Sequence, residues 1–77
     1  MDISKVQEEK MIYINERGLP IDQDVLRGEE ILEVGGFAPN EYDLYLLQDA
    51  NKSKQIENRE TIKIRNGLRF NAILKPT

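Results

Sequence analysis

The chain has 77 residues, with 11 basic and 14 acidic side chains and a formal net charge of −3. It contains neither Cys nor His, which excludes disulfides, thiolate metal sites and histidine-dependent catalytic triads. A single small domain without a basic face or a long apolar run is expected to bind neither nucleic acid nor a membrane. A domain of this size also offers little room for a substrate cleft, so we expect no enzyme activity and no cofactor.

Residues 1–9 form the first segment and hold only Ile3 and Val6 as apolar anchors. Termini without packing contacts are usually mobile, so we expect a flexible N-terminal segment there. The segment is charged and has no apolar stretch, which argues against a signal peptide. Together with the absence of Cys, this favours a cytoplasmic protein.

The stretch KMIYIN, residues 10–15, predicts the first strand because β-branched and aromatic residues are concentrated in it. The letters ERG then predict a turn in which Gly18 takes φ > 0. LPID, residues 19–22, predicts a second strand, and Pro20 places it at a sheet edge because proline donates no ladder hydrogen bond. The two strands are expected to form an antiparallel hairpin over residues 10–24.

A helix of about two turns is predicted within RGEEILEVGGF, residues 27–37. Glu29 and Glu30 lie in its first turn, where carboxylates favour the positive end of the helix dipole. Ile31 and Leu32 begin an apolar stripe. A helix this short does not persist alone in water, so it must lie against a sheet.

The end of this helix is predicted at Gly36, which we expect at φ > 0. Phe37 then folds back for an apolar contact, and Pro39 prevents continuation. The pair Gly35-Gly36 lies in mid-chain, so it is interpreted as a helix cap with close packing and not as a reactive tail.

The second half of the chain predicts strands joined by polar turns. Strands are expected at YDLYLLQ (42–48), QIE (55–57), TIKI (61–64) and LRFNAIL (68–74), with a polar loop at DANKSK (49–54) and a turn at Asn66-Gly67. The fold class is therefore α+β, a ubiquitin-like β-grasp with a mixed four- to five-stranded sheet and one short helix on one face. The connection through the helix is expected to join parallel neighbours.

A family resemblance is carried by the run RGEEILEVGGFAPNEYDLYLL and the later GLRF. Together they resemble the bacterial multiubiquitin domain over about residues 10–74. The family has Ala where this chain has Gly35. The matching positions are Gly28, Ile31, Leu32, Gly36, Tyr42, Leu44, Tyr45, Gly67 and Phe70.

The resemblance implies a small bacterial protein modifier, activated at its C-terminus and conjugated to targets. The implied partners are an activating (adenylating) enzyme, a conjugating enzyme, a JAB-type metallopeptidase and target proteins. The conjugation tail would be Lys75, Pro76 and Thr77. We expect it to project from the last strand without packing, because it has no apolar anchor and Pro76 lacks the N–H to extend the ladder. This tail lacks the glycines that suit a narrow enzyme channel. It is therefore a precursor end, an end used by more tolerant chemistry, or part of a domain that is not conjugated.

Strand alternation predicts a second site, a partner-binding patch on the sheet face opposite the helix. The residues expected to face the helix are Ile12, Ile14, Leu44, Leu46, Phe70 and Ala72. Those expected to face outward are Tyr13, Tyr45, Leu47 and Ile73. Such a patch would suit a non-conjugated β-grasp interaction adaptor, which is the alternative function; scattered surface apolar residues are the simpler interpretation. The acidic pairs Asp22–Asp24 and Glu29–Glu30 are interpreted as solvated, and we expect no metal site.

Overall fold

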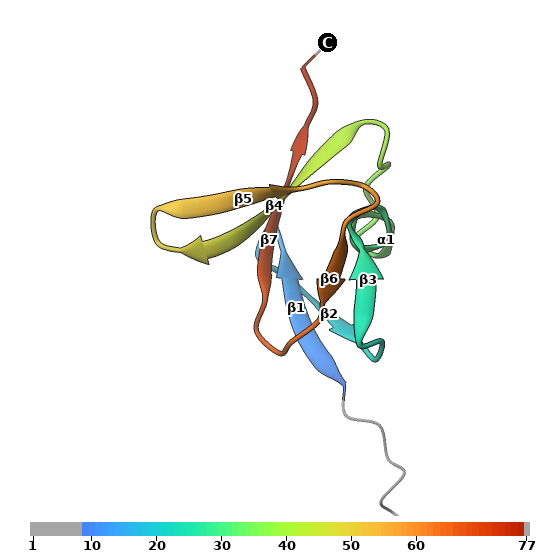
Figure 1. Cartoon of the computed structure of the whole chain (residues 1–77), viewed down its shortest axis with the longest axis vertical. Coiled ribbons are helices and arrows are strands. Elements are labelled where there is room, and N and C mark those ends of the chain that lie inside the picture. The colour runs from blue at the N-terminus through green and yellow to red at the C-terminus, as the bar shows by residue number, and fades with distance from the viewer. Residues whose placement is uncertain (1–8, 77) are drawn as a thin grey trace, which may run out of the picture.

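The computed structural model describes residues 9–76 and contains a five-stranded sheet, a two-stranded sheet and one helix (Figure 1). The strand order in the large sheet is β2-β1-β7-β4-β5, and β3 pairs with β6 in the small one. In chain order the elements are β1 (Lys10–Ile14), β2 (Arg17–Ile21), β3 (Val25–Arg27), α1 (Gly28–Val34), β4 (Tyr42–Asp49), β5 (Lys52–Ile56), β6 (Thr61–Lys63) and β7 (Arg69–Leu74).

The centre of the large sheet is a parallel pair formed by the first and last strands, β1 and β7. The neighbouring pairs β1–β2, β7–β4 and β4–β5 are antiparallel, so the sheet is mixed. This arrangement confirms the predicted α+β, ubiquitin-like β-grasp. One detail was wrong: β2 and β4, the large-sheet strands before and after the helix, run in the same direction but are not neighbours, because they lie on either side of the central pair.

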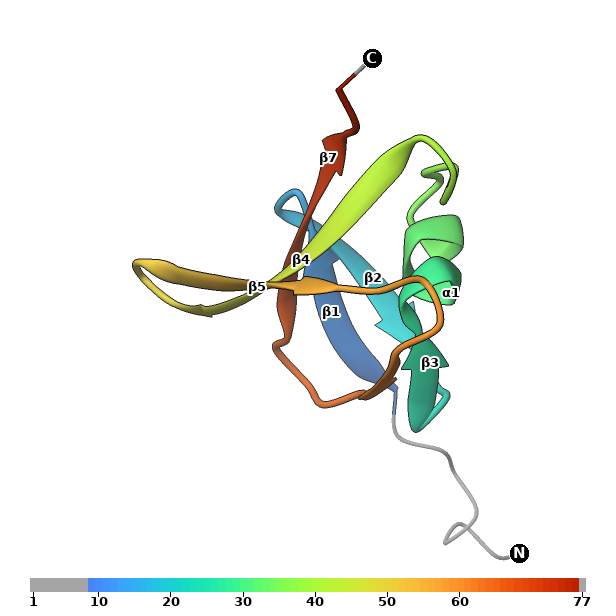
Figure 2. The ribbon, with the colours of Figure 1, turned by 45° about the horizontal axis from the view of Figure 1, so that its top comes forward.

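The core lies between one face of the sheet and α1 (Figure 2). Ile12 and Ile14 on β1, and Phe70 and Ala72 on β7, point into it because alternate strand residues share a face. The helix contributes Ile31 and Leu32, both fully buried. The remaining buried apolar residues are Ile21, Leu26, Leu44, Ile56 and Ile64. Leu46 packs partly buried against this cluster, as expected from its alternation.

The first hairpin turns at a different place from the predicted one. Ile14 pairs with Arg17, leaving Asn15 and Glu16 as a two-residue turn with φ of 51° and 69°. Two-residue hairpin turns of this kind need φ > 0 at both positions, and Asn tolerates it. Gly18 is instead a residue of β2, which lies at the sheet edge as Pro20 predicted.

Gly18 lies opposite Tyr13 in this hairpin, and its lack of a side chain makes room for the aromatic ring. A Cβ at Gly18 would lie 3.3 Å from Cε2 of Tyr13 and 3.2 Å from Sδ of Met11. An aromatic side chain covering a cross-strand glycine shields the exposed backbone at that position. Gly18 is therefore needed for packing against Tyr13 and does not form the turn.

The start of α1 is held by backbone of the loop between β5 and β6. The N–H of Gly28 donates to the carbonyl of Glu60 at 2.9 Å, and the N–H of Glu29 donates to the carbonyl of Asn58 at 3.0 Å. The Glu30 carboxylate accepts from the Arg27 N–H at 2.7 Å. These bonds satisfy donors that a helix N-terminus otherwise leaves unpaired.

The end of α1 confirms the predicted cap, because Gly36 has φ of 86°. Its N–H donates to the Glu33 carbonyl at 3.0 Å, and the Phe37 N–H reaches back to the Leu32 carbonyl at 2.8 Å. This pair of bonds is a Schellman motif. Gly35 packs closely, since a Cβ there would lie 3.0 Å from Cδ1 of Ile14.

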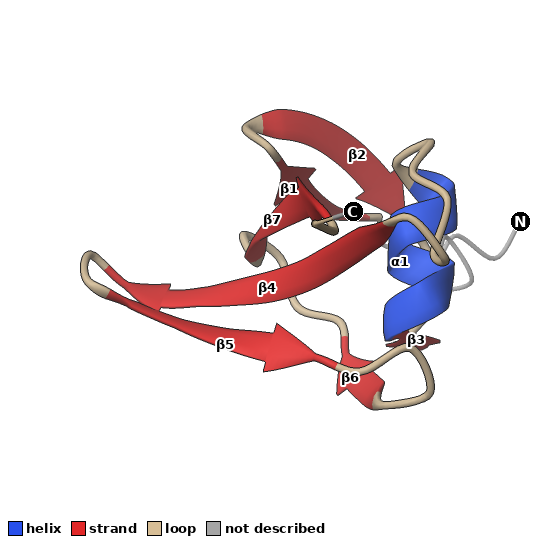
Figure 3. Cartoon of the chain, turned by 90° about the horizontal axis from the view of Figure 1, so that it is seen from above, coloured by secondary structure: helices blue, strands red, loops and turns tan. Residues whose placement is uncertain are grey.

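The predicted polar loop at residues 49–54 is too long, because Asp49 belongs to β4 and residues 52–54 belong to β5, which leaves only Ala50 and Asn51 in the turn. β4 and β5 form a long hairpin that extends beyond the rest of the sheet (Figure 3). The pairing shifts between Leu47 and Asp49, which marks a bulge. β5 is exposed along all but its last residue, Ile56, so it lacks the apolar alternation that identifies a half-buried strand.

Candidate functional site

The structure brings all four residues of the expected partner-binding patch to the outer face of the large sheet. Tyr13 lies on β1, Tyr45 and Leu47 on β4, and Ile73 on β7. Ile73 is 52% exposed and Tyr13 37% exposed, whereas Tyr45 and Leu47 are half-buried. The four therefore share a face but differ in how much surface they offer.

Polar residues interrupt this outer face. Arg69 is the register partner of Tyr13. Tyr45 pairs with Asn71 on one side and Gln55 on the other. Asp43 pairs with Ile73. Cross-strand partners lie side by side on the same face, so the surface is a mixture of apolar and polar groups instead of one continuous apolar patch.

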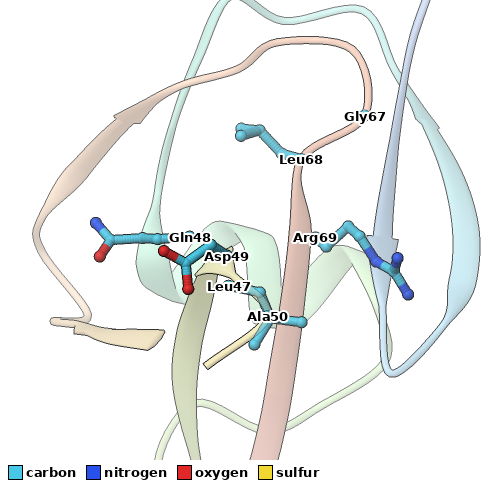
Figure 4. Close-up of a pocket in the computed structure, with 7 residues that line it drawn as sticks. All are labelled: Leu47, Gln48, Asp49, Ala50, Gly67, Leu68 and Arg69. Carbon is cyan, nitrogen blue, oxygen red and sulfur yellow. The ribbon is translucent and has the colours of Figure 1, made fainter. Parts of the chain in front are cut away.

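Two shallow hollows lie beside the start of β7, and Arg69 lines both. Tyr13 and Glu16 complete the first hollow. The second is lined by residues 47–50 and 67–69, where β4 diverges from β7 (Figure 4). Figure 4 shows the Arg69 side chain on the β1 side of β7, with Gln48 and Asp49 on the opposite side. The guanidinium therefore belongs with the first hollow. Alternation did not single out Arg69 or Glu16, because it identifies apolar faces only.

The end of β7 carries the expected conjugation tail. The backbone N–H of Lys75 donates to the Glu41 carbonyl at 2.8 Å, and its Nζ lies 4.0 Å from Oδ1 of Asp43. The expectation that the tail projects without packing is therefore wrong for Lys75, because the ladder with β4 continues one residue past the strand. Pro76 is exposed, and Thr77 lies outside the described residues, as do residues 1–8 of the expected N-terminal segment.

Two carboxylates away from the end of β7 have perturbed acidities. Lys10 Nζ lies 2.9 Å from Oδ1 of Asp24, and this hydrogen bond and charge lower the pKa of Asp24. The Glu60 carboxylate accepts the Glu57 N–H at 3.1 Å and lies 3.4 Å from Lys54 Nζ, which lowers the pKa of Glu60. A lowered pKa means that the ionised form is stabilised by its surroundings, so both carboxylates act as structural counter-charges.

Residues 9–76 show neither a group of potential metal ligands nor a membrane-spanning helix. In that part of the chain, acidic side chains do not gather into a group of three or more with metal-binding geometry. No helix in the described residues has the length and apolar character needed to cross a bilayer.

The sheet order, the parallel central pair and the helix across one face define a ubiquitin-like β-grasp. The family model for multiubiquitin matches residues 11–75, and the chain belongs to the multiubiquitin family. No curated protein and no solved structure matches the chain.

Proposed function

We propose that this domain is a bacterial ubiquitin-like protein modifier, activated at its C-terminus and conjugated to target proteins in the cytoplasm. It performs no catalysis itself. The partners are an activating enzyme that adenylates the terminal carboxylate, a conjugating enzyme, a JAB-type metallopeptidase and the targets. Family membership supports a ubiquitin-like role, although fold alone does not assign an activity.

The observation that carries the proposal is the way the chain leaves the sheet. The last ladder bond is donated by Lys75, and Pro76 has no N–H with which to extend it. The chain is thus released at an open end of the domain, which points away from the body (Figure 1). Ile73 and Leu74, 52% and 59% exposed, come just before this point and offer an enzyme two apolar contacts.

The reaction at this end needs no group from the domain except its carboxylate. A carboxylate oxygen attacks the α-phosphorus of ATP, pyrophosphate leaves, and an acyl adenylate forms. An enzyme thiol or a target amine then attacks the acyl carbon and displaces AMP. The domain supplies a carboxylate that can reach into the enzyme, and it supplies surfaces that hold the enzyme close.

A non-conjugated interaction adaptor is the second candidate, and the outer sheet face favours it. Tyr13 and Ile73 are exposed on the same face as Tyr45 and Leu47, with polar groups between them. Interfaces commonly combine aromatic anchors with a polar surround. An adaptor needs this face but no free carboxylate.

The test is to mix the protein with ATP and the activating enzyme encoded beside it, then to measure intact masses. The modifier proposal expects an adenylate, a covalent adduct with the enzyme or removal of terminal residues. A matched protein with a C-terminal amide should form neither adenylate nor adduct. If this chain and one carried through to the genomic C-terminus both remain unchanged, the modifier proposal is wrong and the adaptor remains.

A second experiment tests whether the outer sheet face is the surface that binds the activating enzyme. Tyr45→Ala with Leu47→Ala should weaken binding to the activating enzyme about tenfold or more if the outer face is the docking surface, because interface anchors are often worth about 2 kcal/mol or more. Val34→Ala is the control, since Val34 is exposed on the helix, away from this face. Equal binding by the double variant and the parent would exclude the outer face.

A further inference from the structure

The hollow formed by Tyr13, Glu16 and Arg69 contains two charged groups that do not neutralise each other. Tyr13 and Arg69 are register partners on β1 and β7, and Glu16 lies in the β1–β2 turn. Among the ion pairs of residues 9–76, which join groups within 4.0 Å, none includes Glu16 or Arg69. The hollow therefore presents one free negative and one free positive charge around an exposed aromatic ring.

Glu16 occupies a backbone position that disfavours it. It is the second residue of the two-residue turn and has φ of 69°, where Gly is the preferred residue. Asn15 tolerates its own positive φ, but a Glu side chain has no such local compensation. Residues held in sparsely populated conformations gather at functional sites. The strained backbone at Glu16 therefore marks its carboxylate as a candidate contact group.

We propose that this face binds a second copy of the chain in a two-fold symmetric contact. In such a contact the same surface meets itself, so a residue i touches j on the other copy while j touches i. Glu16 of each copy would pair with Arg69 of the other, and the two Tyr13 rings would pack near the axis. A surface with opposite free charges around an aromatic ring has the self-complementarity that this symmetry requires.

The dimensions and composition of the face agree with this contact. Two sheets stacked face to face lie about 10 Å apart, a distance that facing Glu and Arg side chains can bridge. Met11 is 38% exposed and lies beside Gly18 next to Tyr13, which adds apolar area. Aromatic residues, Met and Arg are enriched in interfaces. The contact does not depend on conjugation, so a modifier or an adaptor could form it.

The test exchanges the charges and measures association by sedimentation from micromolar to millimolar concentration. Glu16→Arg gives a copy with two positive groups in the hollow, and Arg69→Glu gives one with two negative groups. Each variant alone should associate at least about tenfold more weakly than the parent, because like charges would then face each other. An equimolar mixture of the two should recover association, since each positive group meets a negative one. Salt should weaken the parent contact, because exposed charge pairs are screened.

Matched controls separate this contact from an effect of net charge. Glu33→Arg on the helix and Arg59→Glu in the β5–β6 loop change the net charge equally at exposed positions, and both should associate like the parent. Circular dichroism checks that every variant folds, and Glu16→Lys with Arg69→Asp repeats the exchange if one does not.

Three results would overturn the proposal: a parent that stays monomeric to millimolar concentration, single variants that associate like the parent, or a mixture that does not recover association. A monomeric parent would leave the hollow to a partner of different chemistry.

Discussion

Two glycines in the helix region are required for different physical reasons. At Gly28 an added Cβ would overlap the Glu57 carbonyl oxygen and lie 3.1 Å from Cγ2 of Ile56. At Gly36 the space is open, and the constraint is the backbone φ of 86°. The first glycine therefore permits a close approach between α1 and a loop, whereas the second permits a left-handed helix end.

Substitution at the two glycines should separate these effects. Gly36→Ala should lower the free energy of unfolding by about 1 kcal/mol, the cost of a Cβ in the left-handed region. Gly28→Ala should cost about 1–3 kcal/mol or more, because backbone must move to relieve the overlap. Denaturant midpoints provide the measurement. A D-alanine at 36, introduced by chemical synthesis, should restore stability, and equal losses for D- and L-alanine would contradict the backbone explanation.

The strained turn predicts a stabilising change. Glu16→Gly should raise the free energy of unfolding by up to about 1 kcal/mol, because glycine adopts φ of 69° without a steric cost. The same variant should lose the proposed self-association. Thermal unfolding at low protein concentration measures the first effect and sedimentation measures the second. Glu33→Gly at the exposed helix position is the contrasting control and should be destabilising.

At the scale of elements, the sequence predicted the strands in which apolar and polar side chains alternate, and the helix whose end has a recognisable cap. β1, β4 and β7 were predicted because one face of each is apolar, and the helix end because Gly36 and Pro39 mark it. β3 was missed, since three residues paired with distant β6 leave no local pattern. Of β5, only the last two residues, Gln55 and Ile56, were predicted as strand, because the lysines and polar residues before them are exposed on both faces. The hydrogen bond from Lys75 to Glu41 joins two backbone groups, and side-chain patterns do not predict such bonds.

The candidate surface was also predicted only in part. Alternation placed Tyr13, Tyr45, Leu47 and Ile73 on one face, which is a property of strand geometry alone. It did not give the polar neighbours, because those depend on which strands are adjacent and in what register. Arg69 is beside Tyr13 only because the first and last strands pair.

Lowering the pH should weaken two ion pairs that join parts of the fold. Asp24 joins the segment before β3 to β1 through Lys10, and Glu60 joins the β5–β6 loop to β5 through Lys54. Because the folded pKa of each lies below its ordinary value, their stabilisation is fully present above an ordinary carboxyl pKa of about 4. It is lost as the pH falls through the depressed folded values.

The denaturant midpoint, measured at successive pH values from neutral downward, should therefore decrease once the pH is below about 4. The variant Asp24→Asn with Glu60→Gln should start lower and depend less on pH in that range. An unchanged slope in this variant would show that other carboxylates govern the acid response.

At the scale of the whole molecule, stability depends on one small core. Phe70 is 1% exposed and Leu32 0% exposed, and both belong to the cluster between sheet and helix. A domain of this size buries a smaller fraction of its chain surface than a larger one and has little stability in reserve. Loss of a single large core side chain should therefore affect the entire fold.

Phe70→Ala should lower the free energy of unfolding by about 3–5 kcal/mol, through lost burial and the cavity left behind. We expect a largely unfolded protein by circular dichroism. Leu74→Ala, on the same strand at a 59% exposed position, should change stability by about 0.5 kcal/mol or less. A cooperatively folded Phe70→Ala protein with near-parent stability would contradict the packing described above.

The parallel pairing of β1 and β7 also determines how the domain responds to mechanical force. Because the two strands run in the same direction, the start of β1 and the end of β7 lie at opposite ends of the sheet (Figure 2). Tension applied through both ends of the chain would slide these strands past each other. The hydrogen bonds between them, including those from Tyr13 to Leu68 and from Asn15 to Phe70, would then bear the load together instead of opening one at a time. Pulling on both ends of the domain would therefore meet its greatest resistance at the first step, when these bonds must break together.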